Sequence, residues 1–444
     1  MNWDKLLSAK RLGLEDREFK NTDEIRSQFQ RDYDLIIFSS PFRRLQNKTQ
    51  VFPLPGSIFV HNRLTHSLEV ASVGRSLANL VAQYLQNRED IQNKVILNEL
   101  GSIVSAACLA HDLGNPPFGH AGEVAISKYF LEGNGRKFKN AVTPDEWNDL
   151  TNFEGNANAL RLLTHQFSGR RKGGFALTYT TLASLIKYPY GSNAMIPGKS
   201  KFGYFQAEKD TFLKIVHELG LKKVSDQPAR FARHPLVFLV EAADDICYEI
   251  MDIEDAHKLK ILDTPKTFEL LLNFFDPIKD KHFFEIKEQV FEEVKDLNEQ
   301  VAYLRASVIG KLIRETAEVF IKNHDLILRG EYNQTLIKGL QGKSEEAFEK
   351  CKNLAIREIY NHKSVIKIEL TGFNVLGILL DEFITAIFNP DSNYSQKILS
   401  ILPSQFSVEG HSFYKKALSI VDFVSGMTDL YAVDLYKDIK GINL

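Results

Sequence analysis

Two imidazoles and two carboxylates interrupt stretches of the sequence that are otherwise strongly apolar. His66 lies within a helical pattern, His111 and Asp112 end one apolar run, and Asp244 ends another. Burying an unpaired charge is costly, so a divalent cation held between these segments would compensate the carboxylates. Such a donor set suits Mn, Fe, Co, Ni or Zn, and suits Mg less well. The sequence therefore predicts a metal site whose ligands are His66, His111, Asp112 and Asp244.

Each of these residues also has a simpler interpretation when it is taken alone. A single buried histidine is usually a hydrogen-bonded core residue, and an isolated His-Asp pair is weak evidence for a metal. The combination of Arg63-x-x-His66, the His-Asp pair and the later Asp244-Asp245 pair favours the metal site. Cys108, one helical turn before His111, offers a thiolate for zinc, but a cysteine on an apolar helix is typical of a small core residue.

His120 and Glu123 form a second pair, in the first turn of a predicted helix that follows Pro116-Pro117-Phe118-Gly119. Residues three apart share a helix face, so the carboxylate can orient the imidazole and raise its pKa. That arrangement suits proton transfer near neutral pH, and a helix N-terminus favours phosphate. The alternative is that Glu123 only stabilises the helix N-terminus.

Helical periodicity predicts the elements that position these groups. Helices are expected at Leu64–Leu85, Ile96–Asp112, His120–Leu131 and Pro235–His257. Further helices are expected at about 22–33, 153–167, 178–187, 344–360, 373–388 and 413–431, and a nearly continuous helical pattern covers 264–328. Residues 365–370 alternate like a strand, and residues 53–56 indicate a loop or small hairpin. The Gly- and Pro-containing stretch 188–205 predicts a long loop, a kind of segment that is often functional.

Composition restricts the class of protein. Of 444 residues, 44% are hydrophobic and 25% are charged, which is typical of a globular chain and excludes disorder as the main state. A net charge of −2 argues against polyanion binding by the whole surface but allows a local basic pocket. The basic segment Arg170-Arg171-Lys172 is interpreted as a solvated loop, with nucleic-acid contact as the weaker alternative. The predicted fold class is all-α, with at most a minor β-hairpin.

The cysteines and the apolar runs suggest a location. Three cysteines lie far apart, which excludes a disulfide framework and favours a reducing compartment. The N-terminal residues lack a signal-peptide core, and no run approaches the ~18 apolar residues of a membrane span. The apolar stretch 373–387 is broken by Asp381 and Glu382, which fits a buried helix. We expect a cytoplasmic protein that has no membrane partner.

The order of these motifs resembles a known family. The pattern His…His-Asp…Asp resembles the HD-domain metal-dependent phosphohydrolases, and the chain more closely resembles the deoxyguanosinetriphosphate triphosphohydrolase (dGTPase) family. The matching segments are SPFRRLQ (40–46), KTQVF (48–52), NRLTHSLEV (62–70), HDLGNPPFGHAGE (111–123), FEGN (153–156), KYP (187–189), EAADDICY (241–248) and GMTD (426–429). Leu430 departs from the family, which often has arginine after Thr-Asp. The resemblance implies one dGTPase-like chain over 1–444, with an HD core at about 60–260 and a helical C-terminal region at about 261–444.

The resemblance also implies roles. His120 and Glu123 would be catalytic. Asp244, Tyr248 and Asp252 are spaced i, i+4, i+8 and share one helix face. The family holds deoxyribose at these positions, where the Asp252 carboxylate suits a 3′-hydroxyl and the Tyr248 ring would clash with a 2′-hydroxyl. Asp245 points about 100° away around the helix, so it is the second choice as a ligand and is interpreted as an acid that lies on the helix surface or supports a metal ligand from behind.

The remaining predicted contacts are to the substrate. Arg63, Lys187 and Tyr188 would bind the triphosphate, and Asn115 matches a position near the phosphates or the metal. Gln50 and Val51 match positions beside the nucleoside, where an amide can read a base edge. Arg43 and Arg44 are weaker candidates for phosphate contact, since either residue can pair with a surface acid. These assignments complete the predicted site.

The expected reaction is hydrolysis of dGTP to deoxyguanosine and inorganic triphosphate, with a divalent metal cofactor (Mn, Mg, Co, Ni or Fe). The alternatives are an HD phosphohydrolase of another nucleotide class, such as a nucleoside monophosphatase or guanosine tetraphosphate hydrolase, and a nucleotide-binding regulator. The resemblance further implies a homo-oligomer, with a hexamer as one option, and an effector that is either a nucleotide or single-stranded DNA.

Overall fold

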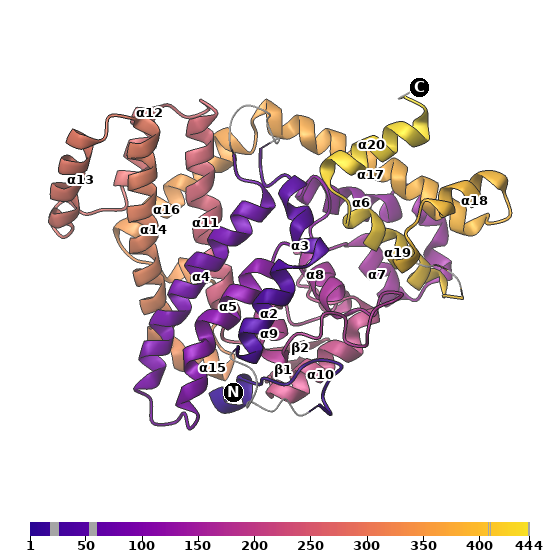
Figure 1. Cartoon of the computed structure of the whole chain (residues 1–444), viewed down its shortest axis with the longest axis horizontal. Helices are drawn as coiled ribbons and strands as arrows, with labels where there is room; N and C mark the ends of the chain where they lie inside the picture. Colours follow the sequence, from indigo (N-terminus) through magenta and orange to yellow (C-terminus); the bar gives the residue numbers. More distant parts are fainter. Residues whose placement is uncertain (18–25, 53–59, 407, 409, 443–444) are drawn as a thin grey trace.

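The computed structural model describes residues 1–17, 26–52, 60–406, 408 and 410–442, and within these residues nearly all of the regular secondary structure is helical. The described strands are β1 (Lys223–Asp226) and β2 (Ala229–Phe231), which pair antiparallel as one short hairpin. The all-α fold class with a minor hairpin is therefore confirmed (Figure 1).

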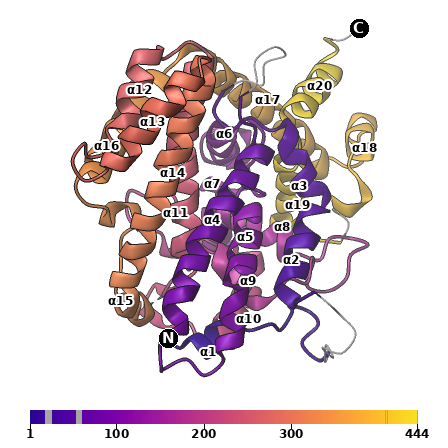
Figure 2. The ribbon, with the colours of Figure 1, turned by 60° about the vertical axis from the view of Figure 1, so that its left-hand side comes forward.

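The centre of the molecule is built on α4 (Arg63–Gln86), which packs against α5 (Leu100–Ala110), α11 (Val237–Lys258) and α14 (Leu297–Lys322). Nearly every residue of α5 is buried, which explains why its sequence is apolar on all sides. Gly74 permits the close approach of α4 to α5, since a Cβ atom there would lie 2.5 Å from the Sγ atom of Cys108. Figure 2 shows these helices side by side, with α2 on the other side of α5.

The remaining helices of the first half surround this centre. They are α1 (Trp3–Leu6), α2 (Gln28–Ile37), α3 (Ser40–Arg44), α6 (His120–Leu131), α7 (Pro144–Thr151), α8 (Gly155–Thr164), α9 (Tyr179–Leu185) and α10 (Lys209–Leu219). The helices predicted around His66, His111, His120 and Asp244 are confirmed within a few residues of their expected ends. Residues 188–205 form the expected long loop, with a single 3-10 turn at Ser192–Ala194.

The continuous helical pattern predicted over 264–328 is wrong in one respect, because the chain breaks there into separate helices. They are α12 (Thr264–Leu272), α13 (Lys281–Glu293), α14 and α15 (His324–Arg329). Aspartates cause two of these starts, since the side chains of Asp263 and Asp296 accept backbone N–H groups in the first turns of α12 and α14. The helix predicted over 413–431 is likewise two helices, α19 (Phe413–Ser425) and α20 (Asp429–Lys440), because Thr428 caps the second.

The strand predicted at 365–370 is also wrong, because these residues form the first turns of α17 (Lys363–Phe388). A short alternating run is ambiguous, and here Val365 is buried while Ile366 and Leu370 are exposed, as helical periodicity requires. The expectation that no run approaches the length of a membrane span is wrong for α17, which is apolar and long enough to cross a membrane by length and composition, although half of its most apolar window is buried. It packs against α6, α18 (Asn393–Ser400), α19 and α20, so the expected buried helix at 373–387 is confirmed (Figure 1).

Three further expectations concern the segments at 22–33, 53–56 and 344–360. The helix expected at about 22–33 is observed as α2, with Ser27 forming a capping box at its start, and residues 18–25 lie outside the described residues. The loop or hairpin expected at 53–56 also lies outside them. The helix expected at 344–360 is α16 (Lys343–Leu354) followed by a π-helical turn, Ala355–Ile359.

Candidate active site

The four predicted metal ligands converge from α4, the end of α5 and α11. Ligand atoms of His66, His111 and Asp112 all lie within 4.8 Å of one another. Asp244 joins them, since its Oδ1 atom lies 3.1 Å from Nε2 of His66 and 3.5 Å from Nε2 of His111. Two imidazole nitrogens and two carboxylates therefore face one point between three helices.

The imidazole of His111 is oriented as a metal ligand requires. Its Nδ1 atom lies 2.6 Å from the carbonyl oxygen of Cys108, so Nδ1 carries the proton and donates it. Its Nε2 atom is buried, makes no hydrogen bond and lies 3.6 Å from Oδ1 of Asp112. A buried lone pair that faces two carboxylates needs a cation between them, so the residues present fit a divalent metal.

Protonation competes with metal binding at this point. Burial lowers the pKa of His111, but Asp112 and Asp244 outweigh burial and raise the pKa to about 9 when no metal is bound. Burial likewise opposes ionisation of Asp244, yet His111 and His66 hold the pKa of this carboxyl well below its usual range. Metal binding at neutral pH therefore displaces a proton.

Asp112 is held by two partners that sequence analysis assigned to the substrate. Nη1 of Arg63 lies 2.6 Å from Oδ2 of Asp112, and both side chains are buried. The amide of Asn115 donates a short hydrogen bond to Oδ1 of Asp112. Both residues also line the cleft in front of the metal point, so they can orient the ligand and face a bound molecule at once.

His120 and Glu123 form the predicted pair. Nδ1 of His120 lies 2.8 Å from Oε2 of Glu123, and Oε1 of Glu123 accepts the backbone N–H of Gly155 at 2.7 Å. The hydrogen bond to Glu123 raises the pKa of His120, although burial opposes the increase. The side chain of His120 is 77% exposed and that of Glu123 is buried, so the carboxylate is fixed and the imidazole tip is open to the cleft.

Backbone strain occurs immediately before this pair. Phe118 has φ of 62°, in the left-handed region that a phenylalanine rarely adopts, and its N–H donates to Oδ1 of Asp429 at 3.0 Å. Gly119 also has positive φ, and a Cβ there would lie 2.7 Å from Nη2 of Arg63. The second carboxylate oxygen of Asp429 accepts the N–H of Thr49 at 2.9 Å. Asp429, the last residue of the motif at 426–429, thus connects the C-terminal region to the loop that positions His120.

Lys201, Glu154 and Lys48 also lie at the site, although the sequence did not predict a role for them. Nζ of Lys201 lies 2.8 Å from Oε1 of Glu154 and 3.7 Å from Oε2 of Glu123. Lys201 belongs to the loop 188–205, and the Gly- and Pro-containing composition of this segment was the only sequence feature that indicated a functional role for it. Buried Lys48 donates to the carbonyls of Asn115 and Ser425, and burial lowers its pKa to about 7.

These side chains surround a cleft of about 250 Å³. The predicted residues that line it are Gln50, Arg63, His111, Asp112, Asn115, His120, Glu123, Lys187, Asp244 and Tyr248. The Oε1 atom of Gln50 is buried without a hydrogen-bond partner, as a group that awaits a ligand would be. Lys187 lies 3.3 Å from Glu241, which Arg233 also binds, so its ammonium group is held beside the cleft.

Three predicted substrate residues lie outside the described lining of this cleft. Tyr188 lines an adjacent cavity of about 560 Å³, which shares Lys187 and Lys201 with the cleft. Asp252 is buried one turn beyond the cleft residue Tyr248, and its Oδ2 atom accepts a hydrogen bond from the Tyr360 hydroxyl at 2.8 Å. Val51 is half-buried against the hydrophobic core.

The weaker candidates have other surroundings. Asp245 also lines the adjacent cavity, and burial raises its pKa to about 7. Arg43 is exposed, whereas Arg44 is partly buried and burial lowers its pKa. Cys108 is fully buried and burial raises the pKa of its thiol, as expected for a core residue.

Comparison with known proteins agrees with this geometry. The HD domain family matches residues 63–144, which contain three of the four predicted ligands, and the phosphohydrolase-associated domain family matches residues 339–438. A deoxyguanosinetriphosphate triphosphohydrolase-like protein of Synechocystis is 39% identical over the full length of both chains. A protein of the same description from Pseudomonas aeruginosa is 37% identical over 99% of each chain.

A third relative, whose name lacks the words "-like protein", supports placing the chain in the same family. The deoxyguanosinetriphosphate triphosphohydrolase of Yersinia pestis is 31% identical over 93% of this chain and 94% of its own. Identity at this level over nearly whole chains, together with the HD domain, is sufficient to place the sequence. The chain therefore belongs to the deoxyguanosinetriphosphate triphosphohydrolase family of HD-domain hydrolases.

Proposed function

We propose that the protein is a metal-dependent dNTP triphosphohydrolase that converts dGTP and water into deoxyguanosine and inorganic triphosphate. The observation that carries the proposal is the position of the His120–Glu123 pair, which lines the same cleft as His111, Asp112 and Asp244. A divalent cation held there by His66, His111, Asp112 and Asp244 would act as a Lewis acid on a phosphate oxygen and activate water.

The bond changes define what the side chains must do. A water oxygen forms a bond to the α-phosphorus, the bond from this phosphorus to the sugar 5′-oxygen breaks, and a proton reaches the 5′-oxygen. His120 would move that proton, because its Nδ1 atom is bound to Glu123 and its Nε2 atom is left for the cleft. Glu123 keeps the imidazole in one orientation and favours the protonated form.

Lys187, Lys201 and Arg63 would bind the phosphate chain. All three line the cleft, and a triphosphate needs several cations for charge compensation. The acidic partners Glu241, Glu154 and Asp112 hold these cations in place before substrate arrives. Tyr248 and Gln50, which line the same cleft, would contact the nucleoside.

A product assay tests this proposal. Purified protein is incubated with each dNTP and either Mn²⁺ or Mg²⁺, and the products are separated. We expect deoxynucleoside and inorganic triphosphate in equal amounts, with dGTP preferred. Deoxynucleoside monophosphate plus pyrophosphate, or no turnover of any dNTP, would contradict the proposal. The same assay with nucleoside monophosphates and guanosine tetraphosphate tests the other HD substrate classes.

A further inference from the structure

The cleft continues into the adjacent cavity of about 560 Å³ that Tyr188 lines. Lys187, Lys201 and Glu241 line both spaces, so two of the three residues at the boundary are cations. The cleft alone, at about 250 Å³, is smaller than most small-molecule sites, which occupy about 300–1,000 Å³. A ligand that is bound in the cleft therefore has room to extend into the adjacent cavity.

The shared lysines indicate which end of a nucleotide would face the adjacent cavity. Gln50 and Tyr248, which are proposed to contact the nucleoside, line the cleft and are absent from the described lining of the adjacent cavity. Lys187 and Lys201, which are proposed to bind phosphate, line both spaces. The distal end of the phosphate chain would therefore point past these lysines into the adjacent cavity. This orientation rests on the proposed function.

Hydrogen bonds between the hairpin and the loop 188–205 fix the walls of the adjacent cavity. The backbone N–H of Phe231 in β2 donates to the carbonyl of Pro189 at 3.2 Å. Nε of Arg230, also in β2, donates to the carbonyl of Ala194 at 2.8 Å. Two elements that are separate in sequence thus form one continuous wall.

A buried carboxylate holds the same loop at two points. Asp149 of α7 accepts the hydroxyl of Ser192 at 2.5 Å and the backbone N–H of Gln206 at 2.6 Å. Lys199 and Lys201 lie between these two anchors. The loop therefore presents both lysines from a segment whose ends are fixed.

Three cations in the lining of the adjacent cavity have no carboxylate partner among the described residues. Lys199 and Lys338 are exposed, and neither forms an ion pair there. Arg230 is half-buried and donates to the carbonyls of Ala194 and Met195, which do not neutralise its charge. The positive charge of these three side chains is thus available to a ligand.

The carboxylates of the described lining do not cancel this charge. They are Glu241 and Asp245. Glu241 already binds Lys187 at 3.3 Å and Arg233 at 2.6 Å, so these two cations are compensated within the wall. Asp245 alone remains opposite the three unpaired cations, and the adjacent cavity keeps an excess of positive charge.

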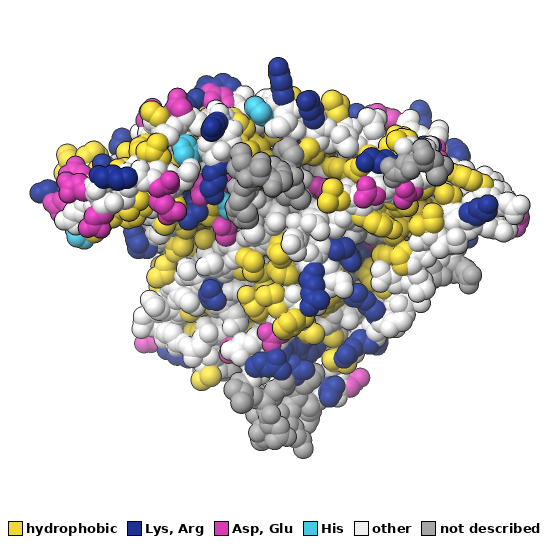
Figure 3. Space-filling model, turned by 45° about the horizontal axis from the view of Figure 1, so that its top comes forward, with side chains coloured by type: hydrophobic (Ala, Val, Ile, Leu, Met, Phe, Trp, Pro, Cys, Tyr) yellow, Lys and Arg dark blue, Asp and Glu magenta, His cyan; other side chains and the backbone are white. Residues whose placement is uncertain are grey.

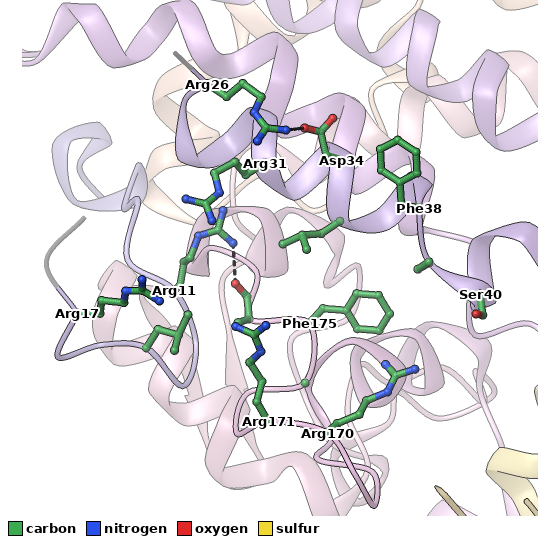
Figure 4. Close-up of a pocket in the computed structure, with 15 residues that line it drawn as sticks. Arg11, Arg17, Arg26, Arg31, Asp34, Phe38, Ser40, Arg170, Arg171 and Phe175 are labelled. Atoms are coloured by element: carbon green, nitrogen blue, oxygen red, sulfur yellow. Dashed lines mark hydrogen bonds and ion pairs between the residues drawn. The ribbon is translucent and has the colours of Figure 1, made fainter. Parts of the chain in front are cut away.

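This excess is local. In the upper part of Figure 3, Asp and Glu side chains are mixed with Lys and Arg, as the net charge of −2 suggests. The cavity between α2 and the loop before α9 also contains arginines, but Arg26 there pairs with Asp34 at 2.7 Å, and Arg11 donates to the carbonyl of Ala176 at 2.7 Å (Figure 4). The adjacent cavity differs because its unpaired cations continue directly from the phosphate-binding side of the cleft.

We propose that the adjacent cavity extends the phosphate subsite of the cleft, so that the protein accepts deoxynucleoside 5′-polyphosphates longer than a triphosphate. Lys199, Arg230 and Lys338 contact the phosphate beyond the γ position through charge-assisted hydrogen bonds. The bond changes are those proposed for dGTP, since a water oxygen binds the α-phosphorus, the bond to the 5′-oxygen breaks and this oxygen takes up a proton. A deoxynucleoside tetraphosphate thus yields deoxynucleoside and intact inorganic tetraphosphate.

Affinity tests the extended subsite without turnover. Full-length H120A protein, which lacks the proposed proton donor, is titrated by calorimetry in Mn²⁺ with dGTP and with deoxyguanosine 5′-tetraphosphate, and chromatography verifies that both nucleotides stay intact. We expect the tetraphosphate to bind about fivefold more tightly or better, because the fourth phosphate gains a charge-assisted contact. Equal affinities, or no binding of either nucleotide at millimolar concentration, would overturn the proposal.

A matched pair of variants separates this contact from general charge attraction. Added to the H120A background, K199Q/K338Q should reduce the ratio of the two affinities to below about twofold, since both unpaired ammonium groups are removed. K137Q/K139Q removes two exposed lysines that lie outside the described lining and should keep the ratio. The same ratio in both variants would contradict the assignment of Lys199 and Lys338.

Turnover by the wild type distinguishes failure of the extended subsite from failure of the proposed function. We expect kcat/KM for the tetraphosphate to lie within about threefold of that for dGTP, with inorganic tetraphosphate as the product. Hydrolysis of dGTP with none of the tetraphosphate would overturn the extended subsite alone. Hydrolysis of neither nucleotide, with an affinity ratio that depends on Lys199 and Lys338, would refute the proposed function and support the extended subsite.

Photocrosslinking locates the distal end of the chain. The γ-azidoanilide of dGTP carries its reactive group beyond the γ-phosphate, and mass spectrometry identifies the labelled peptides. We expect label within 188–201, 224–233 or 327–338, which line the adjacent cavity, and we expect excess deoxyguanosine tetraphosphate to suppress it. Label confined to other segments would overturn the proposal.

Discussion

The Nδ1 atom of His111 is hydrogen-bonded to the carbonyl oxygen of Cys108, three residues earlier on α5, at 2.6 Å. This contact fixes the tautomer of the imidazole and turns Nε2, which has no hydrogen-bond partner, toward Asp112 and Asp244. The backbone of a buried helix end thereby orients the imidazole that is predicted to bind the metal.

Removal of the His111 imidazole should therefore weaken metal binding strongly. We expect H111A to lower the affinity for Mn²⁺ by about 100-fold or more and to reduce turnover in parallel. Titration of Mn²⁺ into chelator-treated protein, followed by thermal shift, measures the affinity. C108A is the matched control, because its carbonyl remains and its thiol is not a ligand. Retention of full metal affinity in H111A would refute the ligand assignment.

The pH profile should report the His120–Glu123 pair. Glu123 favours protonated His120 and raises its pKa above the ordinary 6.5, so E123Q should let this pKa fall. The limb of the kcat profile that depends on His120 should then move to lower pH, whether the imidazole acts as an acid or as a base. Measured rates from pH 5 to pH 10 for wild type and E123Q provide the comparison. An unmoved profile with a lower rate would mean that Glu123 serves only the structure.

Discrimination between sugars should depend on the ring of Tyr248. This ring lines the cleft and lies 6.4 Å from the ring of His66, edge to face. Y248A would open space for a 2′-hydroxyl, and we expect the ratio of kcat/KM for dGTP over GTP to fall by about tenfold. Y248F keeps the ring and should keep the ratio. Equal ratios in all three proteins would remove Tyr248 from sugar selection.

The fold should depend on a buried charge cluster at Arg161. Its guanidinium binds Asp422 of α19 at 2.8 Å and also Glu208, and all three side chains are at most 3% exposed. R161A leaves two buried carboxylates without their cation, so we expect a loss of about 3–5 kcal/mol in the free energy of unfolding. Urea denaturation measures this loss, with exposed R136A as a control near zero. A change below about 1 kcal/mol would be inconsistent with the cluster as a stabilising element.

Much of the site was predictable from residue types and spacing. The helices that carry His66, His120 and Asp244 follow from apolar periodicity, and an acid or imidazole inside an apolar run marks a position that needs a partner. The order of the motifs then predicted the family, which the comparisons confirm. The native metal, the dGTP preference, the oligomeric state, the effector and the cytoplasmic location stay predictions.

Other features were decided only by tertiary structure, because they depend on contacts between residues far apart in sequence. Lys201 contacts Glu123 and Glu154 because of the path that the loop 188–205 takes, and the composition of this segment predicts a loop but not which charges the loop brings together. The start of α14 inside the predicted helical pattern depends on a single capping aspartate, Asp296. Arg11 likewise joins segments far apart in sequence, since it pairs with Asp32 of α2 and donates to the carbonyl of Ala176. Local periodicity determines which segments are helical, whereas long-range packing determines which charges meet.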